Sequence, residues 1–101
     1  MKFERTFVVT CSKGLLRGNH AHLECTQMMV CILGSVKVQV DDSFSQARYS
    51  LNKGSALLIP PGIWSTQDYL EERNILAVWC DKPFDEEDYL RNYDDFIVYK
   101  E

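Results

Sequence analysis

Apolar and polar residues alternate over short segments of this chain, and turn residues separate the segments. Residues 36–40 place valines at every second position, which predicts a strand with one buried face. Residues 28–33 are apolar throughout, which predicts a strand buried on both faces. Together the segments predict strands at 3–10, from 17 onward, and at 28–33, 36–40, 47–51, 56–59 and 75–80. Short strands at intervals of about ten residues are typical of an all-β sandwich or barrel.

The C-terminal part of the chain has a different character. Residues 85–93 begin with four acidic side chains and carry an arginine later, which suits the dipole of a short helix. Tyr89, Tyr93 and Phe96 follow at spacings of four and three and would form one apolar stripe on such a helix. We therefore expect a helix over 85–93 with a solvated acidic face. The alternative for the acidic residues is a surface that binds a partner.

Size and charge narrow the function classes. The 101 residues suffice for a single domain, 1–101, with one core. The formal net charge of -4 and the scattered Lys and Arg residues argue against nucleic acid and anionic membranes as partners. Neither a signal peptide nor a membrane-spanning stretch is recognisable. The four cysteines lack the spacing of a zinc site, so we expect thiols and a cytoplasmic protein.

The two histidines of the chain, His20 and His22, are separated by a single residue. On a strand, side chains two apart point to the same face, so both imidazoles would project together. Histidine ionises near neutral pH, and such a pair can share acid and base roles or bind a metal ion. The alternative is a pair of surface histidines on a solvated face.

The spacing of glycines, prolines and histidines resembles the two motifs of the cupin superfamily. The matching residues are Gly14, His20, His22, Gly34, Gly54, Pro60 and Gly62. The resemblance implies a cupin fold, the double-stranded β-helix or jelly-roll barrel, followed here by the short C-terminal helix. Gln27 stands where cupins carry a glutamate ligand, and Ser65 stands where they carry a third histidine. An amide and a hydroxyl are poor ligands for a transition metal, so we expect neither a bound metal nor a cofactor.

Three segments give a narrower resemblance. They are Arg-Gly-Asn-His-Ala-His at 17–22, Ile-Pro-Pro-Gly-Ile-Trp at 59–64, and Asp-Glu-Glu-Asp-Tyr-Leu-Arg-Asn-Tyr-Asp-Asp-Phe at 85–96. These segments are similar to the WxcM-like cupins, the sugar-nucleotide 3,4-ketoisomerases. The resemblance implies a metal-independent isomerase that shifts a keto group between carbons 4 and 3 of a dTDP-linked 6-deoxyhexose. It also implies a homodimer.

Within that resemblance, His20 and His22 are the expected proton-transfer pair, with the acid and base roles left open. Arg17 lies an odd number of residues from His20 and would face the same cavity only if the strand is bulged near Gly18. Its guanidinium would then bind an enediolate or a diphosphate oxygen. Pairing with an acidic neighbour is the alternative.

Four further residues are expected to bind substrate. The motif register turns Gln27 and Ser65 toward the cavity, where they would hydrogen-bond sugar hydroxyls, each other or water. Trp64 would stack on a base or a sugar, or else pack in the core or a dimer interface. Arg48 would meet the nucleotide, although its place on an alternating hairpin also suits a solvated side chain.

Several positions depart from the family pattern. Phe7 and Val8 stand where members commonly have tyrosines, Ser65 replaces a histidine, and Leu23 replaces a lysine. The chain also starts closer to its first strand than family members do. These differences leave two other functions open: a noncatalytic cupin that binds a sugar nucleotide, and a metal-dependent cupin enzyme.

Overall fold

The structure is a computed structural model that describes residues 2–101, and strands make up most of it. The elements in chain order are β1 (Arg5–Cys11), β2 (Leu16–His22), β3 (Gln27–Leu33), β4 (Ser35–Asp41), β5 (Gln46–Asn52), β6 (Ala56–Ile59), β7 (Trp64–Tyr69), β8 (Asn74–Cys80), η1 (Glu86–Asp88), β9 (Tyr89–Leu90) and α1 (Tyr93–Lys100). Within residues 2–101, no helix is long and apolar enough to cross a membrane.

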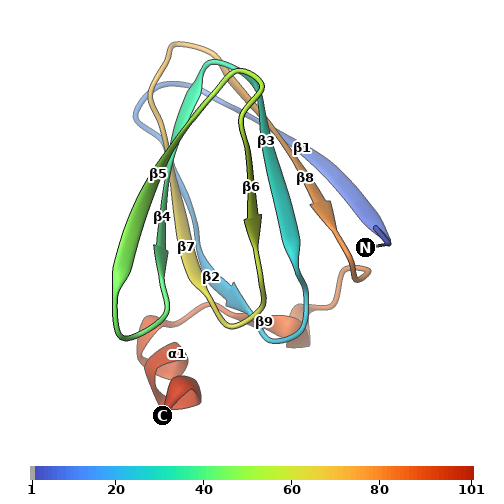
Figure 1. The fold of residues 1–101 in the computed structure, drawn as a ribbon, viewed down its shortest axis with the longest axis vertical. Coiled ribbons are helices and arrows are strands. Elements are labelled where there is room, and N and C mark those ends of the chain that lie inside the picture. The colour runs from blue at the N-terminus through green and yellow to red at the C-terminus, as the bar shows by residue number, and fades with distance from the viewer. Residues whose placement is uncertain (1) are drawn as a thin grey trace.

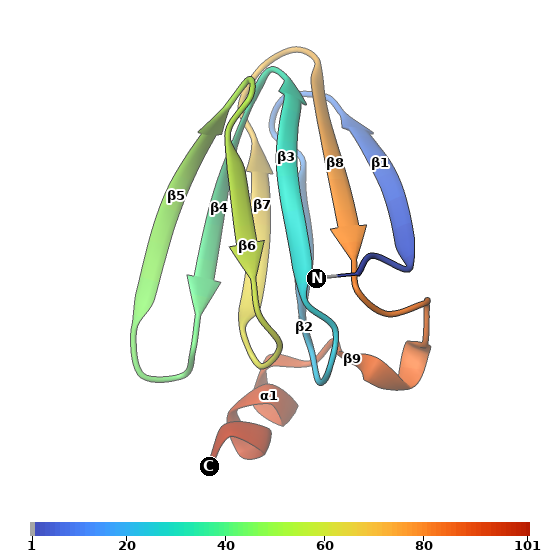
Figure 2. The same ribbon diagram turned by 45° about the vertical axis from the view of Figure 1, so that its right-hand side comes forward.

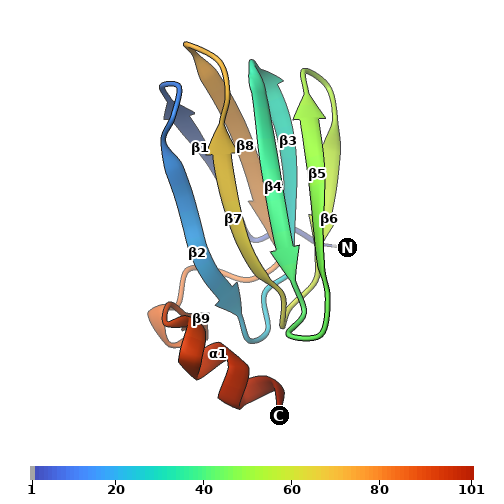
Figure 3. The same ribbon diagram turned by 90° about the vertical axis from the view of Figure 1, so that its left-hand side faces the viewer.

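The strands form two antiparallel sheets that face each other (Figures 1 and 3). One sheet has the order β1-β8-β3-β6 and the other the order β5-β4-β7-β2-β9. The eight longer strands therefore follow the jelly-roll pattern: sequential strands alternate between the two sheets except for the β4–β5 hairpin, and the antiparallel pairs β1-β8, β2-β7 and β3-β6 are nested around it. The all-β cupin fold with a short C-terminal helix, expected from the sequence, is confirmed.

The core fills the space between the two sheets. Inward side chains such as Val36, Val38, Leu76 and Val78 are at most 2% exposed, because each lies on the inner face of an alternating strand. All four cysteines are free and buried. Strand β7 was not foreseen, because its sequence, Trp-Ser-Thr-Gln-Asp-Tyr, has few of the apolar residues that mark a strand.

Strand β3 is not buried on both faces within one chain. Met29 and Cys31 point into the core, whereas Met28 and Val30 are half-buried on the outer face and Ile32 is 45% exposed. The apolar run thus covers an outer sheet face as well as the core.

The helix expected at 85–93 is wrong in position. Residues 86–88 form a single 3-10 turn capped by Asp85, and Tyr89–Leu90 then pairs with the end of β2. The α-helix starts only at Tyr93, because the side chain of Asn92 accepts a hydrogen bond from the backbone N–H of Asp95 and caps it. Figure 2 shows this segment passing below the open end of the two sheets before it enters α1.

Candidate functional site

A bulge in β2 turns Arg17 and His20 to the same face. Arg17 is opposite Gln67 of β7, Gly18 is opposite Thr66, and His20 is opposite Ser65, so Asn19 is an extra residue. Gly18 has φ 91° and Asn19 has φ 58°, values in the left-handed region that glycine and asparagine tolerate best. The extra residue shifts the alternation of the strand by one. The bulge that the sequence analysis required is therefore present, and it turns Arg17 to the same face as the histidines.

The two imidazoles lie side by side at the end of β2. Their ring centroids are 5.0 Å apart with perpendicular planes. His20 Nδ1 lies 3.2 Å from the carbonyl oxygen of Gly18, and His22 Nδ1 lies 3.0 Å from Oδ2 of Asp88. A carbonyl and a carboxylate only accept, so both Nδ1 atoms carry the hydrogen. Both Nε2 atoms are buried and have no hydrogen-bond partner within residues 2–101.

Burial keeps both imidazoles neutral near pH 7. It lowers the pKa of His20 from 6.5 to about 4, and the charge of the neighbouring His22 adds to the effect. Burial also lowers the pKa of His22, but the hydrogen bond and the charge of Asp88 oppose this shift. Each ring therefore presents an unprotonated Nε2 with a free lone pair.

A cavity of about 180 Å³ lies between the sheets beside His20. Strands β1 and β8 line it with the apolar side chains of Phe7, Val9, Leu76 and Val78. The polar lining comes from Arg17, His20, Gln27, Gln67 and Arg91. An apolar wall with a few polar groups and two cations is the usual make-up of a site for a charged small molecule.

The segment after β8 brings three further residues to the histidines. The ring of Tyr89 lies 4.4 Å from the His22 ring and 5.1 Å from the His20 ring. Arg91 lies over the Tyr89 ring at 4.2 Å and forms a two-pronged ion pair with Glu86. Sequence reasoning placed these residues on a helix and missed their role. The available signal was that the family resemblance includes the segment 85–96, which contains all three residues.

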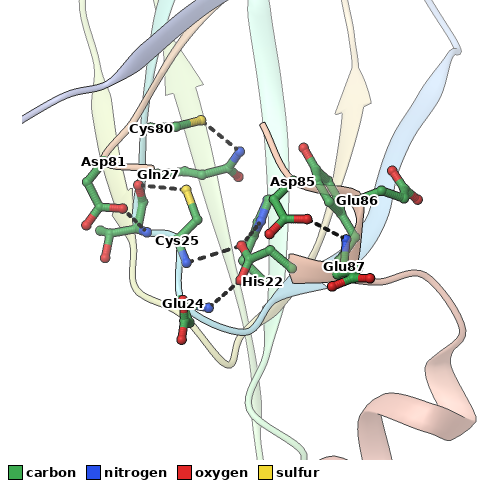
Figure 4. A network of polar contacts seen from close by, with 12 residues as sticks. His22, Glu24, Cys25, Gln27, Cys80, Asp81, Asp85, Glu86 and Glu87 are labelled. Atoms are coloured by element: carbon green, nitrogen blue, oxygen red, sulfur yellow. Dashed lines mark hydrogen bonds and ion pairs between the residues drawn. The ribbon is translucent and has the colours of Figure 1, made fainter. Parts of the chain in front are cut away.

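Gln27 and Gln67 face the cavity from opposite sheets. Gln27 Nε2 donates to Cys80 Sγ at 3.5 Å (Figure 4). Gln67 Nε2 lies 4.0 Å from the sulfur of Met29 and packs against Gly18, where a Cβ would come within 3.0 Å of the amide nitrogen. Gln27 was expected from the sequence. Gln67 was not, because β7 was not recognised as a strand.

Three expected binding residues lie outside the cavity lining. Ser65 is buried opposite His20 on the same face of β7 as Gln67. Trp64 packs against Tyr93 and Phe96 of the C-terminal helix, with ring centroids 5.3 and 5.7 Å away. Arg48 is exposed on β5, far along the sheet from β2.

Three potential metal ligands, His22, Cys25 and Asp88, lie within 4.8 Å of one another. Two of them already bond to each other through His22 Nδ1 and Asp88 Oδ2. The adjoining void is only about 10 Å³ and is also lined by Arg5 and Lys82. These two cations oppose a metal ion at this position.

Similarity to known proteins identifies the family of this chain. The family described as "FdtA: WxcM-like, C-terminal" matches residues 1–101. The chain belongs to the FdtA family of WxcM-like C-terminal domains. A curated relative, the TDP-4-oxo-6-deoxy-alpha-D-glucose-3,4-oxoisomerase of Aneurinibacillus thermoaerophilus, is 32% identical over 84 residues, or 82% of this chain. The match spans 60% of the length of that relative.

Solved structures of family members have the same fold. QdtA, a sugar 3,4-ketoisomerase from Thermoanaerobacterium thermosaccharolyticum solved with TDP, superposes with a TM-score of 0.92 at 32% identity, over 97% of this chain and 73% of its own. WlaRA, a TDP-fucose-3,4-ketoisomerase from Campylobacter jejuni, superposes with a TM-score of 0.94 at 26% identity, over 100% of this chain and 76% of its own. The resemblance first noted in three short segments thus extends over the chain.

Proposed function

We propose that this protein is a 3,4-ketoisomerase of a TDP-linked 6-deoxyhexose that acts by proton transfer through His20 and His22, without a metal ion. One observation carries the proposal. The two imidazoles are neighbours, each uses Nδ1 in a hydrogen bond, and each keeps a buried Nε2 that has no partner within residues 2–101. The names of the matched relatives support the substrate class.

The reaction requires two proton movements. A base removes the hydrogen from C3 of the 4-keto sugar, the electrons of that bond form an enediolate, and a proton returns to C4. A second group takes the proton of the C3 hydroxyl and delivers it to the oxygen on C4. No oxidant or metal is required, but two groups that can accept and donate protons near neutral pH are.

The two histidines suit these two tasks differently. His20 lines the cavity, and its pKa of about 4 leaves Nε2 free to accept a proton from carbon at pH 7. His22 lies behind it and is bonded to Asp88. We assign the carbon proton to His20 and the oxygen proton to His22.

The polar groups around the cavity suit the rest of the substrate. Arg17 and Arg91 would bind the diphosphate, because a guanidinium forms paired hydrogen bonds with phosphate oxygens. Gln27 and Gln67 would hydrogen-bond sugar hydroxyls. Trp64, Ser65 and Arg48 are outside this proposed set of contacts.

A noncatalytic sugar-nucleotide-binding protein is the second candidate. Phe7 lines the cavity, and a phenylalanine offers no hydroxyl where family members commonly have a tyrosine. If the reaction needs that hydroxyl, the chain binds substrate without converting it.

The test is hydrogen exchange with TDP-4-keto-6-deoxyglucose in deuterated water, followed by proton NMR. We expect loss of the C3 signal with wild-type protein and no loss with His20→Asn. His22→Asn should form no 3-keto product, because the proton is no longer carried between the two oxygens. Arg17→Ala should weaken substrate binding, whereas Arg73→Ala, an exposed arginine in the turn before β8, should not. Binding by wild type with no exchange would favour the noncatalytic candidate.

We propose that two chains pair through the outer face of the β1-β8-β3-β6 sheet. This face is apolar in β3, β6 and β8 and carries Val8 between two threonines in β1. By strand register its residues are Thr6, Val8, Thr10, Met28, Val30, Leu33, Ala56, Leu58, Ile75, Ala77 and Trp79, and Ile32 is the extra residue at a bulge in β3. Val8, Ile32 and Leu58 are 61, 45 and 51% exposed in the single chain. A continuous apolar sheet face of this kind is typical of an interface between copies.

Sedimentation tests the dimer. Wild type should sediment at twice the 11.7 kDa of one chain. Val8→Lys should shift it toward the monomer, because the charge would be buried in the interface. Leu16→Lys is the matched control, since Leu16 is 58% exposed on the other sheet. A monomeric wild type contradicts the proposal.

We further propose that the protein works in the cytoplasm, with a nucleotide sugar rather than a nucleic acid or a membrane as its partner. The four free cysteines are compatible with a reducing compartment. The net charge of -4 is unfavourable for binding other polyanions.

A further inference from the structure

Asp88 is the most heavily hydrogen-bonded acidic residue next to the histidines. Its side chain is 12% exposed and accepts from His22 Nδ1, from the backbone N–H of Glu24 at 2.7 Å and from that of Cys25 at 3.3 Å. Its backbone carbonyl accepts from Leu23 at 2.9 Å. Figure 4 shows His22, Glu24 and Cys25 gathered around this point of the turn between β2 and β3.

The two imidazoles differ in what holds their Nδ1 atoms. His20 donates to the carbonyl of Gly18, which is uncharged, whereas His22 donates to a carboxylate. Both contacts fix the ring orientation and leave Nε2 bare. The carbonyl favours a protonated ring through its hydrogen bond alone, whereas the carboxylate adds a negative charge that stabilises the imidazolium further.

The charges around His22 make this difference important. Arg5 and Arg91 disfavour a charged His22, as does burial, and the neighbouring His20 is neutral. Tyr89 covers one side of the ring. Among the described groups that act on His22, Asp88 is the one that favours the imidazolium. Without it, a proton taken up by His22 would have no counter-charge.

We propose that Asp88 is a positioning residue for the isomerisation, which holds Nδ1–H of His22 so that Nε2 faces the sugar oxygens and can carry a proton between them. In this step the C3 hydroxyl O–H bond breaks and an N–H bond forms on Nε2, and the same proton then passes to the C4 oxygen. His22 ends as it began, and Asp88 stays ionised throughout. The inference rests on the proposed function, which it deepens.

Three substitutions separate this role from anchoring of the chain. Asp88→Asn keeps the shape of the side chain, and its Oδ1 can still accept from Glu24. Its amide N–H₂ would face His22, however, and would make Nδ1 an acceptor. Asp85→Asn is the matched control, because Asp85 caps the same 3-10 turn through the N–H of Glu87, whereas the hydrogen bond of His22 Nδ1 goes to Asp88. Asp88→Glu restores the charge and should recover part of the activity.

The first readout is the tautomer of His22, measured from the imidazole nitrogen-15 shifts. We expect Nδ1–H in wild type and in Asp85→Asn, and Nε2–H in Asp88→Asn. The second readout is steady-state kinetics. We expect kcat to fall between about 10²- and 10⁴-fold in Asp88→Asn with KM nearly unchanged, as for loss of one proton-transfer group. The inflection in the pH profile of kcat that is due to His22 should also shift to lower pH, because loss of the Asp88 charge lowers the pKa of His22.

The outcomes are distinguishable. An unchanged tautomer with an unchanged kcat in Asp88→Asn overturns the inference. Equal activity loss in both Asn variants, with an unchanged tautomer, also overturns it and assigns Asp88 to chain anchoring alone. If wild type shows no isomerisation, the proposed function fails, whereas the tautomer measurement still tests whether Asp88 sets the state of His22.

Discussion

Asn74 and the histidine pair lie at opposite ends of the two sheets, and these buried polar groups differ in how fully they are hydrogen-bonded. Asn74, at the start of β8, is 0% exposed. Its Oδ1 accepts from the N–H groups of Ser35 and Glu71, and its Nδ2 donates to the carbonyls of Cys11 and Glu71. All four hydrogen-bonding capacities of this amide are used. Such a group ties three loops together and has nothing left for a ligand.

The two histidines, in contrast, leave part of their hydrogen-bonding capacity unused. His20 and His22 each use one ring nitrogen, and both Nε2 atoms are buried without a partner in the described chain. An unpaired buried polar atom costs stability, so it persists where it serves another purpose. The contrast separates a polar group whose hydrogen bonds are all made within the chain from two that keep a nitrogen free for a ligand, as the proposed function requires.

The largest expected effect is on activity at the histidine end. His20→Asn should lower kcat between about 10²- and 10⁴-fold, because the base at carbon is lost. Its free energy of unfolding should change by less than about 1 kcal/mol, since Nε2 has no hydrogen bond to lose and the asparagine amide can still donate to the Gly18 carbonyl. Kinetics and urea unfolding on the same preparation check both values. A large loss of stability would show that His20 is structural.

Asn74→Ala should produce the reverse pattern. The substitution removes four hydrogen bonds around buried backbone groups, so the free energy of unfolding should fall by at least about 3 kcal/mol. Asn52→Ala, at the exposed end of β5, is the matched control and should change it by less than about 0.5 kcal/mol. Catalysis per folded molecule should be unaffected. Equal stability of the two variants would contradict the contrast.

Gly18→Ala should have an intermediate effect that reaches both properties. A Cβ at Gly18 would lie 2.9 Å from the carbonyl oxygen of Ser65, and the residue has a positive φ. Gly14 also has a positive φ but has open space around it, so Gly14→Ala isolates the backbone strain. We expect a loss of about 1 kcal/mol for Gly14→Ala and clearly more for Gly18→Ala. Only Gly18→Ala should weaken substrate binding, because it moves the bulge that orients Arg17.

The last prediction is a pH dependence of stability from His20. Its pKa in the folded chain is about 4, and in the unfolded chain about 6.5. Between these values the unfolded state binds more protons, so the free energy of unfolding falls as the pH drops from 6.5 toward 4. Above pH 6.5 this group contributes no slope. Urea unfolding at about pH 7, 6 and 5 should show a shallower slope in His20→Asn. Identical slopes would contradict the low pKa.

Several features of the fold were predictable from local sequence. The valines of 36–40 alternate with polar residues, and β4 has the expected buried face. Gly34 and Pro60 mark strand boundaries, and the spacing of the histidines placed them on one side of β2. Each of these signals depends on residues close together in the chain. The position of β9 and α1 was mispredicted because the capping by Asp85 and Asn92 competes with a continuous helix, and periodicity alone does not reveal this.

The sequence by itself determined the all-β class, the family resemblance and the joint projection of His20 and His22, because strand alternation and turn chemistry are local. Only the tertiary structure decided that Asn19 adds a bulge, that Arg17 therefore faces the cavity, and that Trp64 packs under α1 instead. It also decided that Asp88, 66 positions from His22, holds that ring. These facts depend on pairing between strands and segments distant in sequence, and no local periodicity encodes which distant group will meet a given side chain.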